Sequence, residues 1–106
     1  MAQFDVHRNT GKRHEAIPFV VIVQSALFDG FKRRVVVPLV RKSVLGKLPD
    51  TRFNPSFKIE NIVVVLNPLE IVSIGNEQLG EFVKSLSADG DRIVDALDEL
   101  LTRAWG

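Results

Sequence analysis

The chain of 106 residues contains no cysteine. Neither a disulfide framework nor a zinc–thiolate site is therefore available, and this absence fits the reducing cytoplasm. No uninterrupted apolar stretch approaches the roughly 20 residues that a membrane-spanning helix needs. The N-terminal sequence MAQFDVHRNTGKR lacks the basic-then-apolar order of a secretion signal. We therefore expect a soluble cytoplasmic protein without membrane contact, and the length predicts one domain over residues 1–106.

Several catalytic signatures are missing as well. The segment GNEQLG, residues 75–80, lacks the lysine and hydroxyl of a phosphate-binding loop. No histidine–carboxylate cluster has the spacing of metal ligands. His7 in a predicted strand and His14 in a basic turn are interpreted as half-exposed structural residues, and Ser25 lies outside any nucleophile-elbow pattern. These absences favour a binding protein that needs no metal or cofactor over an enzyme.

Charge is distributed unevenly along the chain, although the formal net charge is only +1. Residues 1–53 hold ten Lys and Arg against four Asp and Glu, whereas residues 54–106 hold four against nine. The simplest interpretation is a domain with two faces of opposite sign. A nucleic-acid surface is the alternative, but a pI near 8.1 without an aromatic-rich basic patch makes it the weaker one.

Short apolar runs separated by turn residues dominate the chain as far as residue 74. Glu60-Asn61 predicts the turn of one hairpin and Asp29-Gly30 the turn of another. Pro38 within its strand suggests an edge or a bulge, and residues 41–54 read as a loop with room for one helical turn. Their close spacing is typical of a small antiparallel barrel or sandwich. About six strands are predicted, in residues 3–7, 17–24, 34–40, the two arms of 57–66, and 69–74.

The apolar period changes from 2 to 3.6 near the C-terminus, which predicts an amphipathic helix. Ser87 is the expected N-cap, and Glu99 and Arg103 are expected to form an i,i+4 ion pair. One apolar stripe should pack on the sheet: Ile93, Ala96, Leu97, Leu100, Leu101 and Ala104. Three residues follow one flank of this stripe, which is free to face a second subunit or another protein: Val94, Leu101 and Trp105.

A large apolar pair, Leu27-Phe28, directly precedes the predicted Asp29-Gly30 turn in the segment QSALFDGFKRRVVVPL, residues 24–39. Loop tips usually carry small polar residues, because water surrounds them. Two exposed large side chains at such a place are a poor arrangement for a solitary barrel and a reasonable one for a barrel that docks onto a partner.

Polar residues flank this apolar pair on both sides. Gln24 and Ser25 are expected to end the preceding strand and to make turn hydrogen bonds. Arg33 and Arg34 are interpreted as a solvated hairpin arm, with binding of phosphate or of acidic side chains as the alternative.

The same segment resembles the CcdB family of toxins from bacterial toxin–antitoxin systems. Members carry Val-Gln-Ser, two apolar residues, an aspartate, a variable loop, an arginine and an apolar run ending in Pro-Leu, after a first strand that opens with Gln-Phe. The resemblance covers essentially the whole chain in order. The matching positions are Gln3-Phe4, Val23-Gln24-Ser25, Leu27-Phe28-Asp29, Arg34, Pro38-Leu39, Pro55, Ile59, Ser73 and Leu86-Ser87.

The resemblance implies a mostly β fold, a small SH3-like antiparallel β-barrel with a C-terminal α-helix. It also implies a homodimer that binds the A subunit of DNA gyrase and traps the enzyme on cleaved DNA. A cognate CcdA-like antitoxin would neutralise the toxin and, together with it, repress their operon. DNA would be contacted only indirectly, through gyrase or the antitoxin.

Family members contact gyrase through the apolar pair and the end of the C-terminal helix. The helix register places residues 101–104 where the family has an aromatic pair, a glycine and an aliphatic residue, and Trp105-Gly106 follow. Carried over by position, the expected gyrase contacts are Leu27, Phe28, Val94, Leu101, Thr102, Trp105 and Gly106. The expected supporting residues are Gln24, Ser25, Asp29 and Arg34.

Two alternatives remain open from the sequence. MazF-type toxins, which cleave mRNA, share this architecture and would need a basic, hydroxyl-bearing site, but no acid–base pair is evident here. Such a site would have to draw on Arg13, His14, Arg33 and Arg34. The other alternative is a degenerate family member that binds its antitoxin but poisons nothing.

Overall fold

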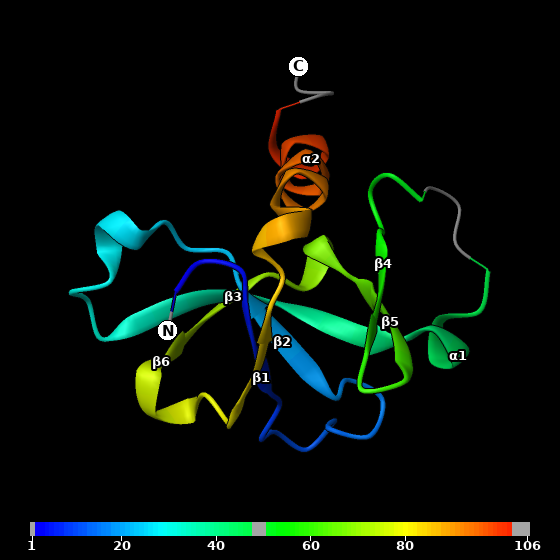
Figure 1. The fold of residues 1–106 in the computed structure, drawn as a ribbon, viewed down its shortest axis with the longest axis horizontal. Coiled ribbons are helices and arrows are strands. Elements are labelled where there is room, and N and C mark those ends of the chain that lie inside the picture. The colour runs from blue at the N-terminus through cyan, green and yellow to red at the C-terminus, as the bar shows by residue number, and fades with distance from the viewer. Residues whose placement is uncertain (1, 48–50, 103–106) are drawn as a thin grey trace.

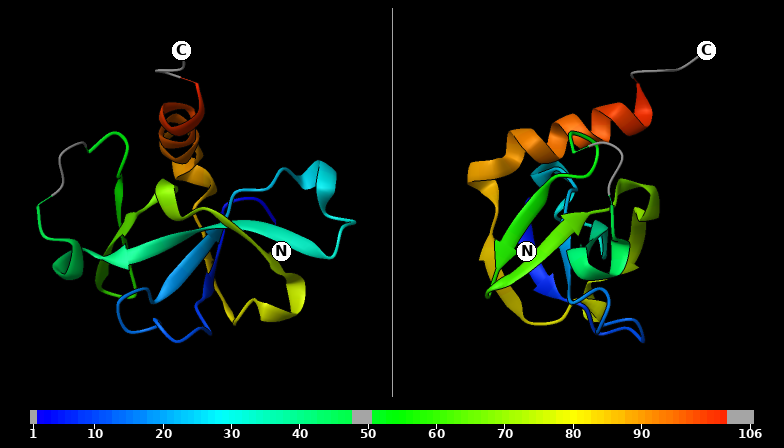
Figure 2. Two further views of the ribbon diagram at one scale, coloured as in Figure 1. Left: turned by 180° about the vertical axis from the view of Figure 1, so that it is seen from behind. Right: turned by 90° about the vertical axis from the view of Figure 1, so that its right-hand side faces the viewer.

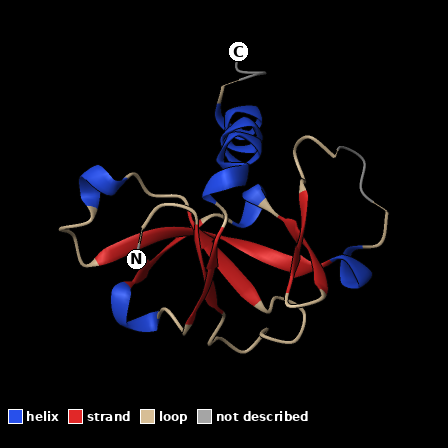
Figure 3. Ribbon diagram, in the orientation of Figure 1, coloured by secondary structure: helices blue, strands red, loops and turns tan. Residues whose placement is uncertain are grey.

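The computed structural model describes residues 2–47 and 51–102 of the chain. In these residues an antiparallel sheet curls into a half-barrel, and a C-terminal helix lies across it (Figures 1 and 2). This arrangement confirms the expected barrel-like fold with a C-terminal helix. The strands described are β1 (Asp5–Arg8), β2 (Phe19–Ile22), β3 (Arg33–Arg41), β4 (Ser56–Ile59), β5 (Ile62–Leu66), β6 (Val72–Gly75) and β7 (Phe82–Ser85). The α-helices described are α1 (Lys42–Leu45) and α2 (Gly90–Leu101). Short 3-10 turns lie in the connections between these elements: η1 (Ala26–Phe28), η2 (Pro68–Glu70), η3 (Asn76–Gln78) and η4 (Ser87–Asp89) (Figure 3).

β3 is the longest of these strands and holds the sheet together. The described strands follow the order β4-β5-β3-β2-β1-β7, and β6 also pairs with β3. β3 pairs with β2 along one edge, while its other edge pairs first with β6 and then with β5. The prediction that Pro38 marks an edge or a bulge is wrong, since Pro38 lies inside the sheet. Its carbonyl accepts from the Asn67 N–H at 3.1 Å, between the β6 and β5 pairings, so its missing N–H falls where no ladder partner is required.

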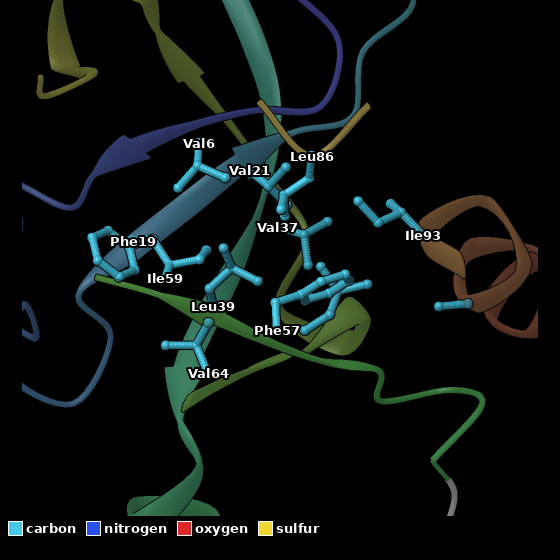
Figure 4. Close-up of a cluster of buried hydrophobic side chains, with 12 residues drawn as sticks. Val6, Phe19, Val21, Val37, Leu39, Phe57, Ile59, Val64, Leu86 and Ile93 are labelled. Carbon is cyan, nitrogen blue, oxygen red and sulfur yellow. The ribbon is translucent and has the colours of Figure 1, made fainter. Parts of the chain in front are cut away.

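β2 is buried on both faces, which explains its continuous apolar run. Alternate residues of β2 and β3 face a main core that also contains Ile93 and Ala96 of α2 (Figure 4). The intervening residues Val20, Ile22 and Val36 form a second cluster on the other face of the sheet. Period-2 geometry therefore splits one apolar strand between two cores.

The β4–β5 hairpin turns at Glu60 and Asn61, as predicted. Both residues have positive φ angles, 52° and 64°, and Ile59 pairs with Ile62 across the turn. Two consecutive left-handed residues match the twist of a two-residue hairpin, and asparagine tolerates this conformation well. Arg8 of β1 reaches this turn, because its Nη1 and Nη2 donate to the two carboxylate oxygens of Glu60 at 3.0 and 2.7 Å. This hydrogen bonding lowers the pKa of Glu60.

α2 packs on the sheet through its apolar face. Ile93 and Ala96 are fully buried, and Leu97 and Leu100 are half-buried, as the stripe predicted. Leu101 is 69% exposed and so belongs to the flank rather than to the buried stripe, and Ala104 lies outside the described residues. Arg92 adds a polar attachment to β4, since its Nη2 donates to the Ser56 carbonyl at 2.8 Å and its guanidinium lies 4.6 Å from the centre of the Phe57 ring.

Two sequence expectations about the last third of the chain are wrong or shifted, and a third stays a prediction. β7, which pairs with β1, was not among the expected strands. The helix begins at Gly90 with Asp89 as N-cap, because Ser87 instead opens the preceding turn η4. The expected Glu99–Arg103 pair extends outside the described residues, and Glu99 lies 3.7 Å from Arg52. In the part of the chain that the structure describes, no helix is long and apolar enough to cross a membrane.

Candidate partner-binding site

The connection between β2 and β3, residues 23–32, is a loop with its own internal hydrogen bonds rather than a tight turn. Ser25 caps η1, since its Oγ accepts from the Leu27 N–H at 3.2 Å. The Phe28 N–H donates to the Ser25 carbonyl at 3.0 Å, and the Asp29 N–H donates to the Ala26 carbonyl at 3.1 Å. The apolar pair therefore lies within a 3-10 turn. The sequence had suggested instead that the pair stands beside a two-residue hairpin turn.

Arg34 holds the second half of this loop from inside the protein. Its side chain is 3% exposed, which corrects the interpretation of Arg34 as a solvated arm. Its guanidinium donates to the main-chain carbonyls of Asp29, Phe31 and Arg33 at 2.9, 2.7 and 2.8 Å. A charged donor makes stronger hydrogen bonds than a neutral one, so this single side chain holds the backbone at three points.

Gln24 holds the loop from the other side. Its Nε2 donates to the carbonyls of Phe28 and Arg33 at 3.0 and 3.2 Å, and its Oε1 accepts from the Val35 N–H at 3.0 Å. The amide thus joins the tip of the loop to the start of β3. Both ends of this side chain are satisfied, and an arrangement of this kind fixes backbone geometry.

Three large apolar side chains project from this held backbone, and we call them the apolar patch: Leu27, Phe28 and Phe31. They are 86%, 50% and 66% exposed. The rings of Phe28 and Phe31 lie 6.1 Å apart, centre to centre, at an angle of 53°. Sequence reasoning singled out the first two residues and missed Phe31. The signal was present, because Phe31 follows directly after the Asp29-Gly30 pair.

The helical half of the expected contact surface lies elsewhere. Val94 and Leu101 on α2 are 44% and 69% exposed. Thr102 ends the helix, since its N–H and hydroxyl both donate to the Asp98 carbonyl, at 2.9 and 3.0 Å. Figure 1 places the cyan β2–β3 loop and the orange-to-red helix at separate positions around the sheet, so the chain does not bring the two groups together. The remaining expected contacts, Trp105 and Gly106, lie outside the described residues.

The four residues considered for an RNA-cleaving site do not converge. Arg13 and His14 lie in the loop before β2, whereas Arg33 and Arg34 follow the loop after it, so they lie at opposite ends of that strand. Arg34 is occupied by loop carbonyls, and Arg33 binds the hydroxyl and carbonyl of Ser73 at 2.8 and 2.7 Å. Arg13 lies 3.4 Å from Glu70. These four residues therefore supply no general acid and base at one place.

The two histidines differ from each other in environment. His7 is buried rather than half-exposed, with Nδ1 2.9 Å from the Gly80 carbonyl oxygen and its ring edge-on to Phe82 at 5.8 Å. His14 is exposed in the β1–β2 loop. Within residues 2–47 and 51–102, no group of three or more His, Asp or Glu side chains is arranged to hold a metal ion.

An open groove of about 410 Å³ lies beside Arg13, on the face of the sheet that carries the second apolar cluster. Its floor is aliphatic, with Val20, Val36 and Pro38 among its lining residues, and Lys12 joins Arg13 and Glu70 among the polar ones. This groove is separate from the apolar patch, because none of the residues that line the groove belongs to the patch.

The half-barrel fold also occurs in solved structures. A structure of an endoribonuclease from a mycobacterial species, in complex with its cognate antitoxin, superposes with a TM-score of 0.74 at 17% identity over 100% of this chain and 99% of that one. A second structure of a mycobacterial endoribonuclease gives a TM-score of 0.71 at 19% identity, over 100% and 95% of the two chains. At such identities the likeness establishes a common half-barrel fold alone. A search of the curated proteins finds no significant match.

The family is shown by sequence. A family model described as CcdB protein matches residues 3–103, nearly the whole chain. The chain therefore belongs to the CcdB family. CcdB proteins are the toxins of toxin–antitoxin systems and are not themselves enzymes, so this protein is a toxin whose partner is a cognate antitoxin.

Proposed function

We propose that the protein is a gyrase poison. As a homodimer it binds the A subunit of DNA gyrase and traps the complex of gyrase with cleaved DNA. The cognate antitoxin releases it from gyrase and joins it in repressing the operon that encodes both. Contact with DNA is indirect, through gyrase or through the antitoxin.

The observation that carries this proposal is the pair Leu27 and Phe28 on a hydrogen-bonded loop. Exposed large apolar side chains cost solvation free energy in the free protein, so their presence favours a partner that buries them. A few anchors of this kind typically supply most of the binding free energy of an interface. Because Gln24 and Arg34 already hold the backbone, little conformational entropy remains to be lost on docking.

The second half of the proposed contact is the exposed flank of α2. Val94 and Leu101 stand on this flank, and Thr102, Trp105 and Gly106 follow at the end of the chain. The apolar run of residues 62–66 does not supply the dimer surface by itself, since Val64, Val65 and Leu66 are buried in the protein's own core. The dimer is proposed instead from the family and from the small size of the chain.

A gyrase cleavage assay tests the proposal directly. Purified protein is mixed with DNA gyrase and supercoiled plasmid, and linear DNA is measured after denaturation of the enzyme. We expect linear DNA to accumulate with the wild-type protein and not with a Leu27→Ala/Phe28→Ala double variant. Val44→Ala, which truncates a 54% exposed side chain on α1, is the matched control and should behave as wild type. Accumulation that is equal in all three proteins would contradict the loop assignment.

The C-terminal half needs its own variant. We expect Trp105→Ala, or truncation after Arg103, to abolish growth arrest while the melting temperature stays unchanged. Arrest that persists in the truncated protein would show that the tail is dispensable. Expression in cells whose gyrase resists such poisons gives the matching control, because arrest by the proposed route should be relieved there.

The endoribonuclease alternative rests on one observation, the fold shared with the mycobacterial endoribonucleases. Against it stand the separation of Arg13 from Arg33 and the occupation of Arg34 by loop carbonyls. Incubation of the purified protein with RNA tests it, and cleavage that is lost in Arg13→Ala would replace the gyrase proposal. If neither RNA nor gyrase responds while antitoxin still binds, the protein is a family member without poisoning activity.

A further inference from the structure

Phe31 shares its setting with the two residues proposed for gyrase contact. Its ring lies 6.1 Å from that of Phe28, and its side chain is 66% exposed, more than the 50% of Phe28 itself. The Phe31 N–H donates to the Phe28 carbonyl at 3.1 Å, so the two residues are linked through the backbone as well. The two rings and Leu27 together make one projecting apolar surface rather than a pair with an unrelated neighbour.

The backbone of Phe31 is held from beneath. Its carbonyl accepts from Nη1 of Arg34 at 2.7 Å and from Nδ2 of Asn76 at 3.4 Å. The next residue is fixed too, because the Lys32 carbonyl accepts from the Asn76 N–H at 2.9 Å. Phe31 is therefore positioned by β3 on one side and by η3 on the other, and only its two side-chain torsions are free. Aromatic side chains with so little freedom make efficient interface anchors.

The environment of Phe31 offers no internal reason for its size. The buried residues of the two apolar clusters do not include Phe31. A large ring on a fixed backbone, turned to solvent and next to a proposed contact residue, is explained by a partner that covers it.

We propose that Phe31 is a third anchor of the gyrase contact. The inference rests on the proposed function, because it assigns Phe31 to the same partner as Leu27 and Phe28. The rings of Phe28 and Phe31 lie close to each other, so a gyrase A subunit that buries Phe28 would cover Phe31 as well.

Binding of the purified gyrase A subunit to the full-length protein tests this inference. We expect Phe31→Ala to raise Kd at least tenfold, equivalent to about 1.4 kcal/mol. Phe31→Leu, which keeps an apolar side chain, should restore most of the affinity. Phe82→Ala is the matched control: Phe82 is 52% exposed on β7, three strands away from β3 in the sheet order, and its truncation should change Kd less than twofold.

The outcomes separate this inference from the proposed function. If Phe31→Ala binds like wild type while Leu27→Ala and Phe28→Ala bind weakly, Phe31 is not an anchor and the gyrase proposal stands. If the wild-type protein does not bind the gyrase A subunit at all, both fail. Equal weakening by Phe31→Ala and Phe82→Ala would indicate a general loss of structure and would also overturn the assignment. Thermal unfolding of each variant checks this point, and a melting temperature within 2 °C or so of wild type is expected for a substitution at a solvent-exposed position.

Discussion

The ring of Phe4 fills the space in which a side chain on Gly90 would stand. A Cβ at Gly90 would come within 2.7 Å of Cε2 of Phe4. Phe4 has a positive φ of 71°, its N–H donates to the Ile22 carbonyl, and its carbonyl accepts from the Leu86 N–H at 2.8 Å. The first residue of α2 is thereby pressed against the N-terminal segment, which in turn is tied to β2.

Gly90→Ala should destabilise the protein even though alanine is the better helix former. The gain in helix propensity is at most about 1 kcal/mol, whereas forcing a methyl group into a packed ring costs about 1–3 kcal/mol. Chemical denaturation measures the difference. Gly30→Ala is the control, because a Cβ there meets nothing within 4 Å, and it should lie within about 0.5 kcal/mol of wild type. If the two side chains collide, the double variant Phe4→Leu/Gly90→Ala should lose less stability than the two single variants lose together. A loss equal to that sum would contradict the contact.

Neighbouring residues of α2 should respond very differently to truncation. Ile93 is fully buried in the main core, so Ile93→Ala should lower the free energy of unfolding by about 2–5 kcal/mol. Val94 is 44% exposed on the flank, and Val94→Ala should change it by no more than about 0.5 kcal/mol. Urea denaturation of both variants provides the comparison. Similar losses at the two positions would mean that the flank is buried in the protein as it exists in solution, for example by a second subunit.

Arg34→Ala should loosen the β2–β3 loop. Removing hydrogen bonds from a charged donor costs about 1–3 kcal/mol, and three main-chain carbonyls lose their donor here. Hydrogen exchange of the Asp29 and Phe31 amides should accelerate more than exchange in β2. Arg34→Lys should restore only part of the protection, because an ammonium group lacks the planar spread of a guanidinium. Unchanged exchange in Arg34→Ala would show that Gln24 alone suffices.

The Arg8–Glu60 pair predicts a small pH effect on stability. Hydrogen bonding to Arg8 lowers the pKa of Glu60 in the folded protein below its ordinary value of 4.5. A carboxyl group with a lowered folded-state pKa stabilises the fold above its unfolded-state pKa, and this contribution is lost as the pH falls through the folded-state value. Wild type should therefore be slightly more stable than Glu60→Gln at pH 7, and the difference should vanish well below pH 4.5. Both groups are exposed, so added salt should also reduce this difference in stability. A difference that stays constant as the pH falls would rule out the Arg8–Glu60 pair as its source.

The predictable parts of the fold are those with a strong local signal. Glu60-Asn61 was recognisable because two polar residues, one of them an asparagine that tolerates positive φ, stand between apolar runs. The helix was recognisable from its 3.6-residue period. The single helical turn after β3 appears as α1 within the loop where it was expected.

The parts that were missed depend on tertiary contacts. β7 has only Val83 half-buried and its other residues exposed, so almost no apolar pattern marks it, and pairing with β1 alone makes it a strand. Pro38 reads as an edge residue because the sequence does not reveal that the neighbours of β3 change at that point. Asp89 rather than Ser87 is the N-cap, because a 3-10 turn precedes the helix at the point where Phe4 contacts Gly90.

The candidate site divides in the same way. The apolar character of Leu27 and Phe28 was evident from composition, whereas the burial of Arg34 was not, since consecutive arginines normally indicate solvent. Phe31 was overlooked because the turn was expected to end at Gly30. A ten-residue connection with an internal 3-10 turn has no such boundary, and residues on both sides of the Asp29-Gly30 pair reach the same surface.

The hydrogen bonds that shape the β2–β3 loop run from Gln24 and Arg34 to main-chain carbonyl oxygens. Every amino acid supplies such a carbonyl, so these hydrogen bonds do not depend on which side chains stand at positions 27, 28 and 31. In the proposed contact, recognition and architecture therefore depend on different residues of one short segment. Substitutions at these three positions would then change the target of the loop while the fold that holds the loop stays the same.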